Sequence, residues 1–434
     1  MLKNMKKIFL FLFGIIVLFL VLSAVMFVFK LCPPKGPWIT PPWCSAGFIR
    51  YNYSVSTNPI AFPQIKAVNM SDTWGRNYNM NMIESTRDNI VSSFSRVKEL
   101  GVKEVYVNDF DRAVFDDGAD FTTTQYTIVD EIFLNDMRDE AMTENDIKTL
   151  VETAHAQGLL LGIKRNMSFV NIGKYISAGI KGEIQANVEA DYEKFNSSHT
   201  EEWIRDYFNK WNERMMAKAT LYQKYGVDIM SITPTWMGPT FTEHETLANE
   251  LQKKLIADVR KVFKGKVHVE VSRFGFFENK DGNEDWMKYD YYKDADVVEI
   301  SIRELPEKYR DGEMEVELPK YLADLNRVAG EKQTQISLFF APSSYRDSMK
   351  HGSLEVLDYN SDAVKNAVAD YEYQSKVFEI FFSSLPLLSH IERTNVGSFS
   401  WDDALDPEVK PKLSVASTFR NKPAEEIIKA WFTK

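Results

Sequence analysis

The sequence predicts an α/β protein, a (β/α)8 (TIM) barrel preceded by a single N-terminal transmembrane helix. Eight apolar strand candidates, each followed by a helical pattern, favour the barrel. One complete unit is Thr143–Arg165, in which Thr143 can cap a helix and Leu159–Ile163 is the nearly continuous apolar run of a strand buried on both faces. A doubly wound sheet is the alternative architecture.

Length and composition indicate one large folded domain behind an anchor. The chain has 434 residues, 44% of them hydrophobic, and a formal charge of -10 with no basic run beyond the N-terminal lysines, which argues against a nucleic-acid partner. We expect residues 1–30 to form a cytoplasmic tip and membrane anchor, residues 31–62 a stalk rich in proline and aromatic residues, and residues 63–434 the barrel.

The N-terminal stretch has the features of a signal anchor. Ile8–Phe29 carries no charged residue, and as a helix at about 1.5 Å per residue it would be roughly 33 Å long, enough to cross a bilayer. Lys3, Lys6 and Lys7 precede it and favour a cytoplasmic N-terminus, so the barrel would lie outside a cell membrane that the chain crosses once. A signal peptide cleaved at Ala24 is the alternative.

The two cysteines, Cys32 and Cys44, lie among prolines just beyond this stretch. In an oxidising exterior they predict a disulfide that closes a small loop, worth about 3 kcal/mol by the chain-entropy estimate. Two free thiols are the alternative. No histidine shares their spacing, so we expect no metal there.

The expected elements alternate along the rest of the chain. The strand candidates are Ile65–Met70, Val102–Asn108, Leu159–Ile163, Val227–Ile232, Val267–Ser272, Val297–Ile302, Gln335–Phe340 and Val396–Trp401. The helical patterns are Ile83–Leu100, Glu144–Gln157, Glu201–Tyr225, Thr242–Phe263, Asn283–Tyr292, Leu318–Ala329, Ser361–Ser383 and Ala424–Phe432. Two longer inserts, Phe110–Met142 and Met167–Thr200, follow strands, where a barrel builds its active-site face.

Several stretches resemble the retaining glycosidases with barrel folds, nearest the β-mannanase-like group. SRVKELGVKEVYV resembles the group's first helix and second strand, LVETAHAQGLLLGIK its second helix and third strand, and LYQKYGVDIMSI its third helix and fourth strand. VGSFSWDD resembles the last strand and RNKPAEEIIKAWF the final helix. The resemblance covers about Ile65–Lys434 and implies a carbohydrate-active barrel.

The resemblance also implies a glutamate acid/base at the end of the fourth strand and a glutamate nucleophile at the end of the seventh. Thr235 stands about where the first belongs, and the seventh strand offers Phe339 and Phe340 with no carboxylate. Both family glutamates are therefore missing from the matching positions. Either other carboxylates perform the hydrolysis, or the barrel retains only a binding cleft.

Strand alternation points to two other glutamates. If the valines of the fifth strand and the apolar residues of the sixth face the helices, Glu270 and Glu299 face the barrel interior on adjacent strands. Strands lie about 4.8 Å apart, close to the roughly 5 Å between the carboxyl groups of retaining glycosidases. The pair is thus a candidate acid and nucleophile. The alternative is a buried ion network in which Arg273, Arg303 and Lys164 neutralise both glutamates.

Other candidates follow the strands at the face where barrel enzymes work. Asp402, next to Trp401, is assigned with the catalytic set as an acceptor of a sugar hydroxyl. The expected substrate-binding residues, whose alternative is capping or packing under the loops, are Asp109, Trp74, Trp236, Arg303, Tyr345 and Trp401.

No dinucleotide fingerprint, P-loop, metalloprotease helix or serine-nucleophile elbow occurs, so we expect neither a cofactor nor a metal. The sequence predicts a membrane-anchored, extracellular glycoside hydrolase-like protein acting on a polysaccharide or oligosaccharide. The alternatives are a catalytically inactive glycan-binding or cell-surface structural barrel and, less favoured, a transglycosylase. The oligomeric state is left open.

Overall fold

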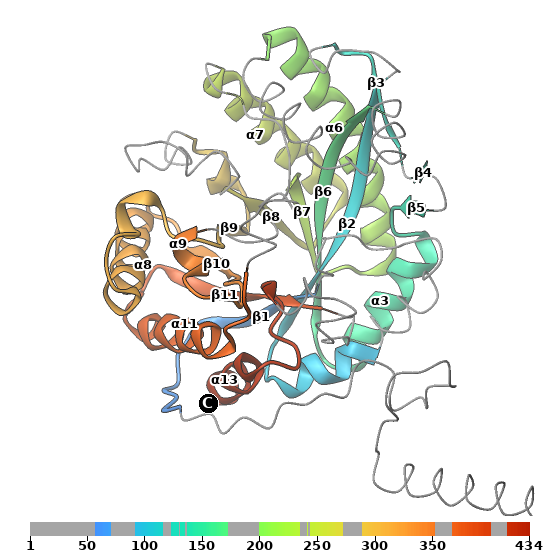
Figure 1. The fold of residues 1–434 in the computed structure, drawn as a ribbon. Helices are drawn as coiled ribbons and strands as arrows, with labels where there is room; N and C mark the ends of the chain where they lie inside the picture. Colours follow the sequence, from blue (N-terminus) through green and yellow to red (C-terminus); the bar gives the residue numbers. More distant parts are fainter. Residues whose placement is uncertain are drawn as a thin grey trace, which may run out of the picture.

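Eight parallel strands close into a barrel, in which β1 pairs with both β2 and β11. The computed structural model describes residues 57–70, 92–115, 123–129, 131–134, 137–171, 199–234, 241, 244–271, 289–351, 367–400 and 415–434. The barrel strands are β1 (Ile65–Met70), β2 (Glu104–Phe115), β6 (Leu160–Asn171), β7 (Ile229–Pro234), β8 (Lys266–Glu270), β9 (Val297–Ile302), β10 (Ile336–Phe340) and β11 (Ile391–Phe399). The predicted (β/α)8 barrel is confirmed (Figure 1).

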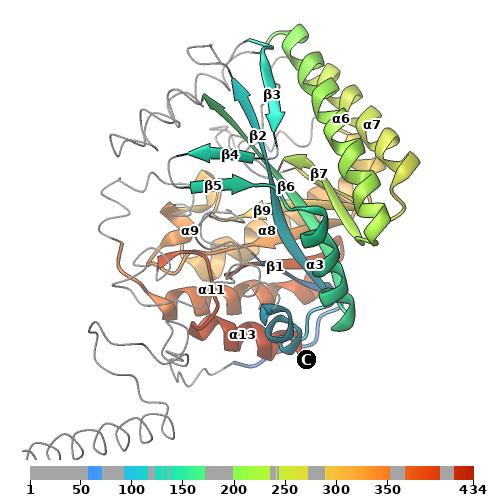
Figure 2. The ribbon, with the colours of Figure 1, turned by 90° about the vertical axis from the view of Figure 1, so that its right-hand side faces the viewer.

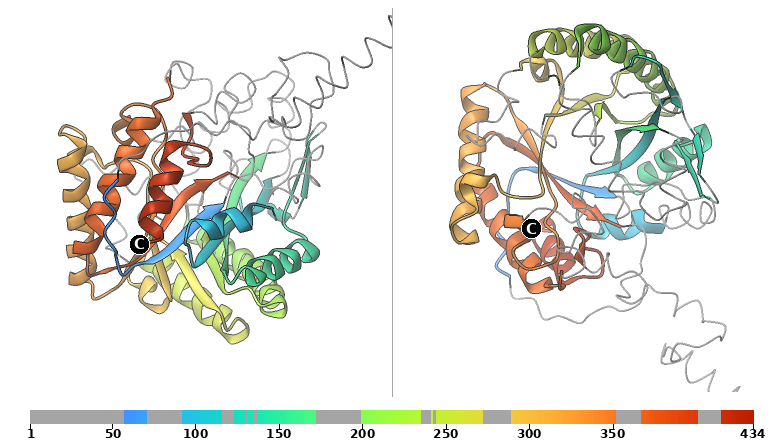
Figure 3. Two further views of the ribbon diagram at one scale, coloured as in Figure 1. Left: turned by 90° about the horizontal axis from the view of Figure 1, so that it is seen from below. Right: turned by 45° about the horizontal axis from the view of Figure 1, so that its top comes forward.

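Helices surround the strands, as the view in the right panel of Figure 3 shows. They are α3 (Glu144–Ala156), α6 (Glu201–Tyr225), α7 (Glu245–Val262), α8 (Met314–Glu331), α9 (Ser348–His351), α11 (Tyr371–Ser384) and α13 (Pro423–Phe432), with a further helix over 92–99 and 3-10 turns η3 (Tyr291–Asp294), η4 (Glu307–Tyr309) and η5 (Leu385–Leu387). Thr143 caps α3 by a complete capping box with Asp146, as the sequence predicts.

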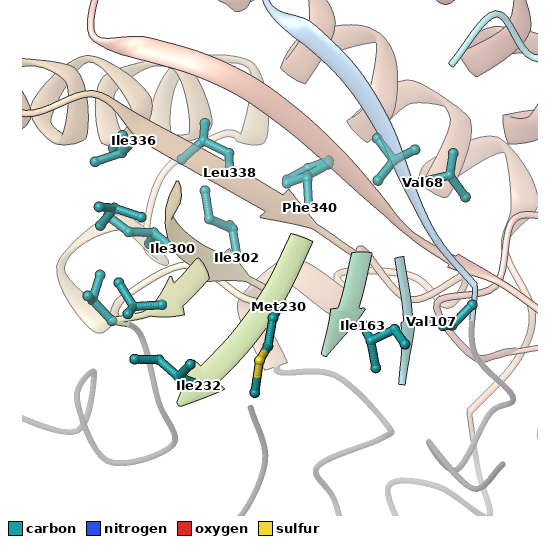
Figure 4. Close-up of a cluster of buried hydrophobic side chains, with 14 of the residues drawn as sticks. Val68, Val107, Ile163, Met230, Ile232, Ile300, Ile302, Ile336, Leu338 and Phe340 are labelled. Carbon is teal, nitrogen blue, oxygen red and sulfur yellow. The ribbon is translucent and has the colours of Figure 1, made fainter. Parts of the chain in front are cut away.

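The alternation of the strands separates two layers of side chains. Apolar residues of one parity face the helices and join one core, of which Figure 4 shows Val68, Ile163 and Phe340 among others. The opposite parity gives a separate interior cluster of Ala67, Tyr106, Ile229 and Val297. The polar and charged side chains inside the barrel therefore belong to the strand positions that alternate with those of the apolar core.

Two strands are much longer than expected. β2 and β6 pair over their whole lengths of 12 residues, from Glu104 with Leu160 to Phe115 with Asn171. The antiparallel strand β3 (Tyr126–Val129) pairs with the last residues of β2 (Figure 2). A two-stranded sheet of β4 (Glu131–Leu134) and β5 (Met137–Glu140) completes the insert that the sequence places over Phe110–Met142.

The predicted anchor and disulfide lie outside the residues that the structure describes, since these begin at Thr57. Within the described ranges, no helix has the length and apolar character needed to cross a bilayer.

Candidate functional site

A buried carboxylate, Glu299 of β9, lies in the barrel interior. Its Oε1 is ion-paired with Lys164 from β6, and its Oε2 accepts a hydrogen bond of 2.8 Å from the Nδ2 of Asn395 on β11. The Nε2 of His268 on β8 lies 3.6 Å from the same Oε2. Four strands therefore contribute to one polar layer around this carboxylate.

This layer keeps Glu299 ionised. Burial alone would raise the pKa of Glu299, but Lys164, together with His268 and Asn395, holds that pKa well below its usual range. Burial lowers the pKa of His268 and thus favours the neutral imidazole. Glu299 is fully buried and already neutralised by Lys164, which supports the ion-network interpretation of this residue over an acid or nucleophile role.

A second ion pair lies in the interior nearer the start of the strands. Arg393 Nε donates to Glu104 Oε2 at 2.6 Å, and the Tyr106 hydroxyl donates to the same oxygen at 3.1 Å. The Tyr106 ring packs against His268 with 5.9 Å between centroids, which links the two polar layers. Gly162 leaves the space for this ring, because a Cβ there would lie 2.4 Å from the Cδ1 of Tyr106.

Glu270 ends β8 and is the Cα register partner of Glu299, so the predicted placement on adjacent strands holds. The residue is 6% exposed, and its backbone N–H donates to Thr233 Oγ1 at 2.7 Å. Because Glu299 belongs to the layer around Lys164, Glu270 is the one of the two that remains a candidate for contact with a ligand.

Phe339 fills the interior at the end of the seventh barrel strand. The Nζ of Lys164 lies 4.5 Å from the Phe339 ring centroid, and the Arg303 guanidinium lies 5.0 Å from it. Gly397 on the adjacent strand makes room, since a Cβ there would lie 2.2 Å from the ring. The ring therefore contacts one buried cation and one half-buried cation that directly follows β9.

Tyr345 follows β10 and is 8% exposed. It forms an isolated β-bridge with Ala369 just before α11. Burial and the nearby Glu304 carboxylate raise the pKa of Tyr345 to about 12, so its phenol stays protonated. Glu304 in turn pairs with Arg310 at 3.2 Å. Tyr345 and Arg303 are the expected binding residues that the structure places after strand ends of the barrel.

The structure corrects the expected placement of Asp109. β2 continues to Phe115, and Asp109 shares the parity of Val105 and Val107, so it faces the helices and is fully buried. Its carboxylate is ion-paired with Arg165 and accepts a 2.7 Å hydrogen bond from the backbone of Met142. It lies on the helix side of the sheet, away from the barrel interior.

Asp109 belongs to a charged cluster that sequence reasoning missed. Arg165 also pairs with Asp111, whose other oxygen accepts from Arg214 Nε at 2.7 Å. Arg165 Nη1 donates to the Tyr222 hydroxyl at 2.9 Å, and the hydroxyl donates to Asp109 at 3.3 Å. Strand alternation puts Asp109, Asp111 and Arg165 on one face once β2 and β6 are known to continue past Asn108 and Ile163.

The remaining candidates, namely Trp74, Trp236, Trp401 and Asp402, lie outside the described ranges, as do Thr235 and Arg273. Across the residues that are described, no group of three or more histidine, cysteine or carboxylate side chains is arranged to hold a metal ion.

Solved structures share the fold of this chain. No family model and no curated protein matches the chain. The GH113 β-mannanase AaManA from Alicyclobacillus acidocaldarius superposes with a TM-score of 0.53 at 16% identity, covering 86% of this chain and 98% of that one. Two further structures described as GH113 β-1,4-mannanase give TM-scores of 0.55 at 13% and 14% identity, each covering 86% of this chain and 100% of the other.

At these identities the likeness is one of fold. The expected resemblance to the β-mannanase-like group is confirmed at that level, and the chain is a glycoside hydrolase-like barrel.

Proposed function

We propose that this protein is a membrane-anchored barrel that binds a polysaccharide or oligosaccharide outside the membrane and does not hydrolyse it with Glu270 and Glu299. The likeness to β-mannanases supports a carbohydrate ligand. Barrel proteins place their sites at the carboxyl ends of the strands, which is where Glu270, Arg303 and Tyr345 stand. The uncharged stretch Ile8–Phe29 supports the anchor.

The observation that carries the proposal is the environment of Glu299. A retaining mechanism needs one carboxylic acid that gives up its proton and one accessible nucleophile, both flanking the scissile bond. Glu299 fits neither role, because Lys164 neutralises it and its side chain has 0% exposure. The paired-glutamate mechanism therefore lacks its second member.

Glu270 fits a binding role at this face. A carboxylate accepts hydrogen bonds from sugar hydroxyls, and Arg303 and Tyr345 supply donors at the same ends of the strands. Trp236 and Trp401, which the sequence places after the fourth and eighth strands, suit stacking on sugar rings. Asp402 would accept a hydrogen bond from a further sugar hydroxyl.

The test measures retention and turnover together. The full chain is run in affinity electrophoresis through gels containing mannan, cellulose, chitin or a uronic-acid polymer, and each polymer is then examined for shortened or elongated products. We expect retardation in at least one gel, weakened about tenfold by Glu270→Gln or Asp402→Asn, with no new products. Glu299→Gln serves as the buried control and should bind normally if it folds.

Two outcomes would contradict the proposal. Products that disappear in Glu270→Gln would show a catalytic carboxylate, with elongated chains indicating transglycosylation and shortened chains hydrolysis. Retardation that is unchanged in both Glu270→Gln and Asp402→Asn would show that the ligand binds elsewhere.

A further inference from the structure

A patch of apolar and basic side chains lies where the strands begin, on the opposite side of the barrel from the proposed sugar site. We name it the strand-entry patch. It consists of Ile60, Lys66, Lys98, Lys103, Leu160 and Leu387.

Backbone hydrogen bonds connect the residues of the basic part of the patch. The backbone N–H of Lys103 donates to the carbonyl oxygen of Lys66 at 2.8 Å, and the backbone N–H of Leu160 donates to the carbonyl oxygen of Lys103 at 3.0 Å. Burial, together with the charge of Lys103, lowers the pKa of Lys66. The Lys98 ammonium lies within 3.8 Å of the position of a Cβ on Gly158, two residues before Leu160.

The apolar part adjoins it through the segment that leads into β1. Gln64 donates to the backbone carbonyls of Leu385 and Leu388 at 2.9 and 3.1 Å, which brings this segment against the turn that contains Leu387. Lys66 Nζ donates to the carbonyl of Phe432 at 2.7 Å, so the end of α13 also lies here, as the left panel of Figure 3 shows. Lys434, two residues beyond α13, is another exposed lysine.

The exposed apolar side chains are concentrated on this patch. Ile60 is 61% exposed, Leu160 40% and Leu387 84%, and they are three of the five large exposed hydrophobic residues in the described part of the chain. The other two, Val316 and Val368, belong to the opposite end of the barrel, near the beginnings of α8 and α11. Apolar side chains among cations are typical of surfaces that lie in the headgroup region of a bilayer.

Three of the six residues that define the patch are lysines. The protein carries a formal charge of -10, yet Lys98 and Lys103 form no ion pair with any described residue. Unpaired cations beside exposed apolar groups suit acidic phospholipid headgroups, which attract lysines that lie within a Debye length of the membrane.

We infer that the strand-entry patch docks on an anionic phospholipid bilayer and directs the carboxyl ends of the strands away from the membrane. The inference rests on the proposed membrane anchoring. Its support is that the described chain begins three residues before Ile60, at Thr57, whose hydroxyl donates to Glu379 of α11 at 2.9 Å, and that the uncharged stretch Ile8–Phe29 precedes it in the sequence. A docked barrel would present its sugar site to the exterior.

The experiment compares the full chain in nanodiscs of phosphatidylcholine with the same chain in discs containing phosphatidylglycerol. Hydrogen–deuterium exchange is followed in peptides covering 57–64 and 385–390. We expect about fivefold slower exchange of these peptides in the anionic discs only, reversed by 0.5 M salt. The charge-reversed variant Lys98→Glu/Lys103→Glu and the polar variant Ile60→Ser/Leu387→Ser should each lose the protection.

Val316→Ser/Val368→Ser is the matched control, because it removes equally exposed apolar groups from the other end of the barrel and should keep the protection. Exchange in β9 and β10 verifies that every variant is folded. A chain that stays with the discs but shows equal exchange in both lipids overturns the docking and leaves the anchor standing. A chain that does not stay with the discs overturns both.

Discussion

Lys164 and Glu299 form an ion pair across the interior of the barrel, from β6 to β9, with side-chain exposures of 4% and 0%. Removing one partner leaves a buried charge without compensation, whereas replacing both by apolar groups does not. We expect Lys164→Met to reduce the free energy of unfolding by about 3–5 kcal/mol, and Lys164→Met/Glu299→Leu to be more stable than that single variant. Urea denaturation measures both.

The matched control for this pair is Lys148→Met. Lys148 and Glu152 form an exposed pair with 3.9 Å between Nζ and Oε1, so its loss should cost less than about 1 kcal/mol. Equal costs for Lys164→Met and Lys148→Met would show that the interior pair is not needed for the stability of the barrel.

The same carboxylate predicts a pH dependence. The folded pKa of Glu299 is lowered, so its contribution to stability is fully present above the unfolded value of about 4.3 and is lost as the pH falls through the lower folded value. The stability difference between the wild type and Glu299→Gln should therefore be largest at neutral pH and narrow below pH ~4.3. Denaturation curves between pH 7 and pH 2 test this; parallel stability profiles would contradict it.

The buried side chain of His199 should make the stability depend on pH in a second range, at higher pH than for Glu299. Its ring stacks on Trp203 at 3.8 Å, and burial lowers its pKa to about 4. A depressed histidine pKa contributes stability that is present above the unfolded value of about 6.5 and lost as the pH falls toward the folded one. Thermal unfolding of His199→Phe should depend less on pH than that of the wild type between pH 7 and pH 4. Identical slopes would show that His199 is not protected from protonation.

The cluster around Arg165 predicts that Asp109 serves stability and not binding. Asp109→Asn weakens an ion pair whose members both have 0% exposure, and we expect a loss of about 3 kcal/mol without a change in polysaccharide retention. Glu270→Gln should show the reverse, with retention weakened and stability nearly kept. Loss of retention in folded Asp109→Asn would restore the sequence-based assignment of this residue.

Adding a side chain at Gly162 should destabilise the protein by overpacking. An alanine Cβ would meet the Tyr106 ring at 2.4 Å, and overpacking of this kind typically costs about 1–3 kcal/mol. Gly226→Ala is the comparison, because no atom lies within 4 Å of its Cβ position and only its φ of +79° is strained, worth about 1 kcal/mol. We expect unfolding midpoints to fall further for Gly162→Ala than for Gly226→Ala.

The barrel was predictable because each strand carries its own apolar run between recognisable helices. The predicted Ile65–Met70 and Val297–Ile302 coincide with β1 and β9, and Glu201–Tyr225 coincides with α6. The ends of β2 and β6 were not predictable in the same way. Polar residues such as Asp111 and Arg165 interrupt the apolar pattern there, and the strand continues because buried ion pairs replace apolar contacts.

The sequence predicted which side chains face the barrel interior, but it did not decide what those side chains do there. Alternation places Glu270, Glu299 and Lys164 on the inner face, as the structure has them. Spacing alone left both a catalytic pair and an ion network open. The choice for Glu299 depends on contacts with Lys164 and Asn395 from strands far apart in sequence, which no local pattern encodes.

The adjacent cations Lys164 and Arg165 point to opposite faces of β6, and each meets its own carboxylates, Glu299 inside and the two aspartates of β2 outside. A slip of β6 by one residue against its neighbours would exchange the two faces. Lys164 would then face α6, Arg165 would enter the crowded interior, and both sets of buried carboxylates would be mismatched at once. The two neighbouring charges thus specify a single alignment of the strand, which apolar residues of similar shape would enforce less strictly.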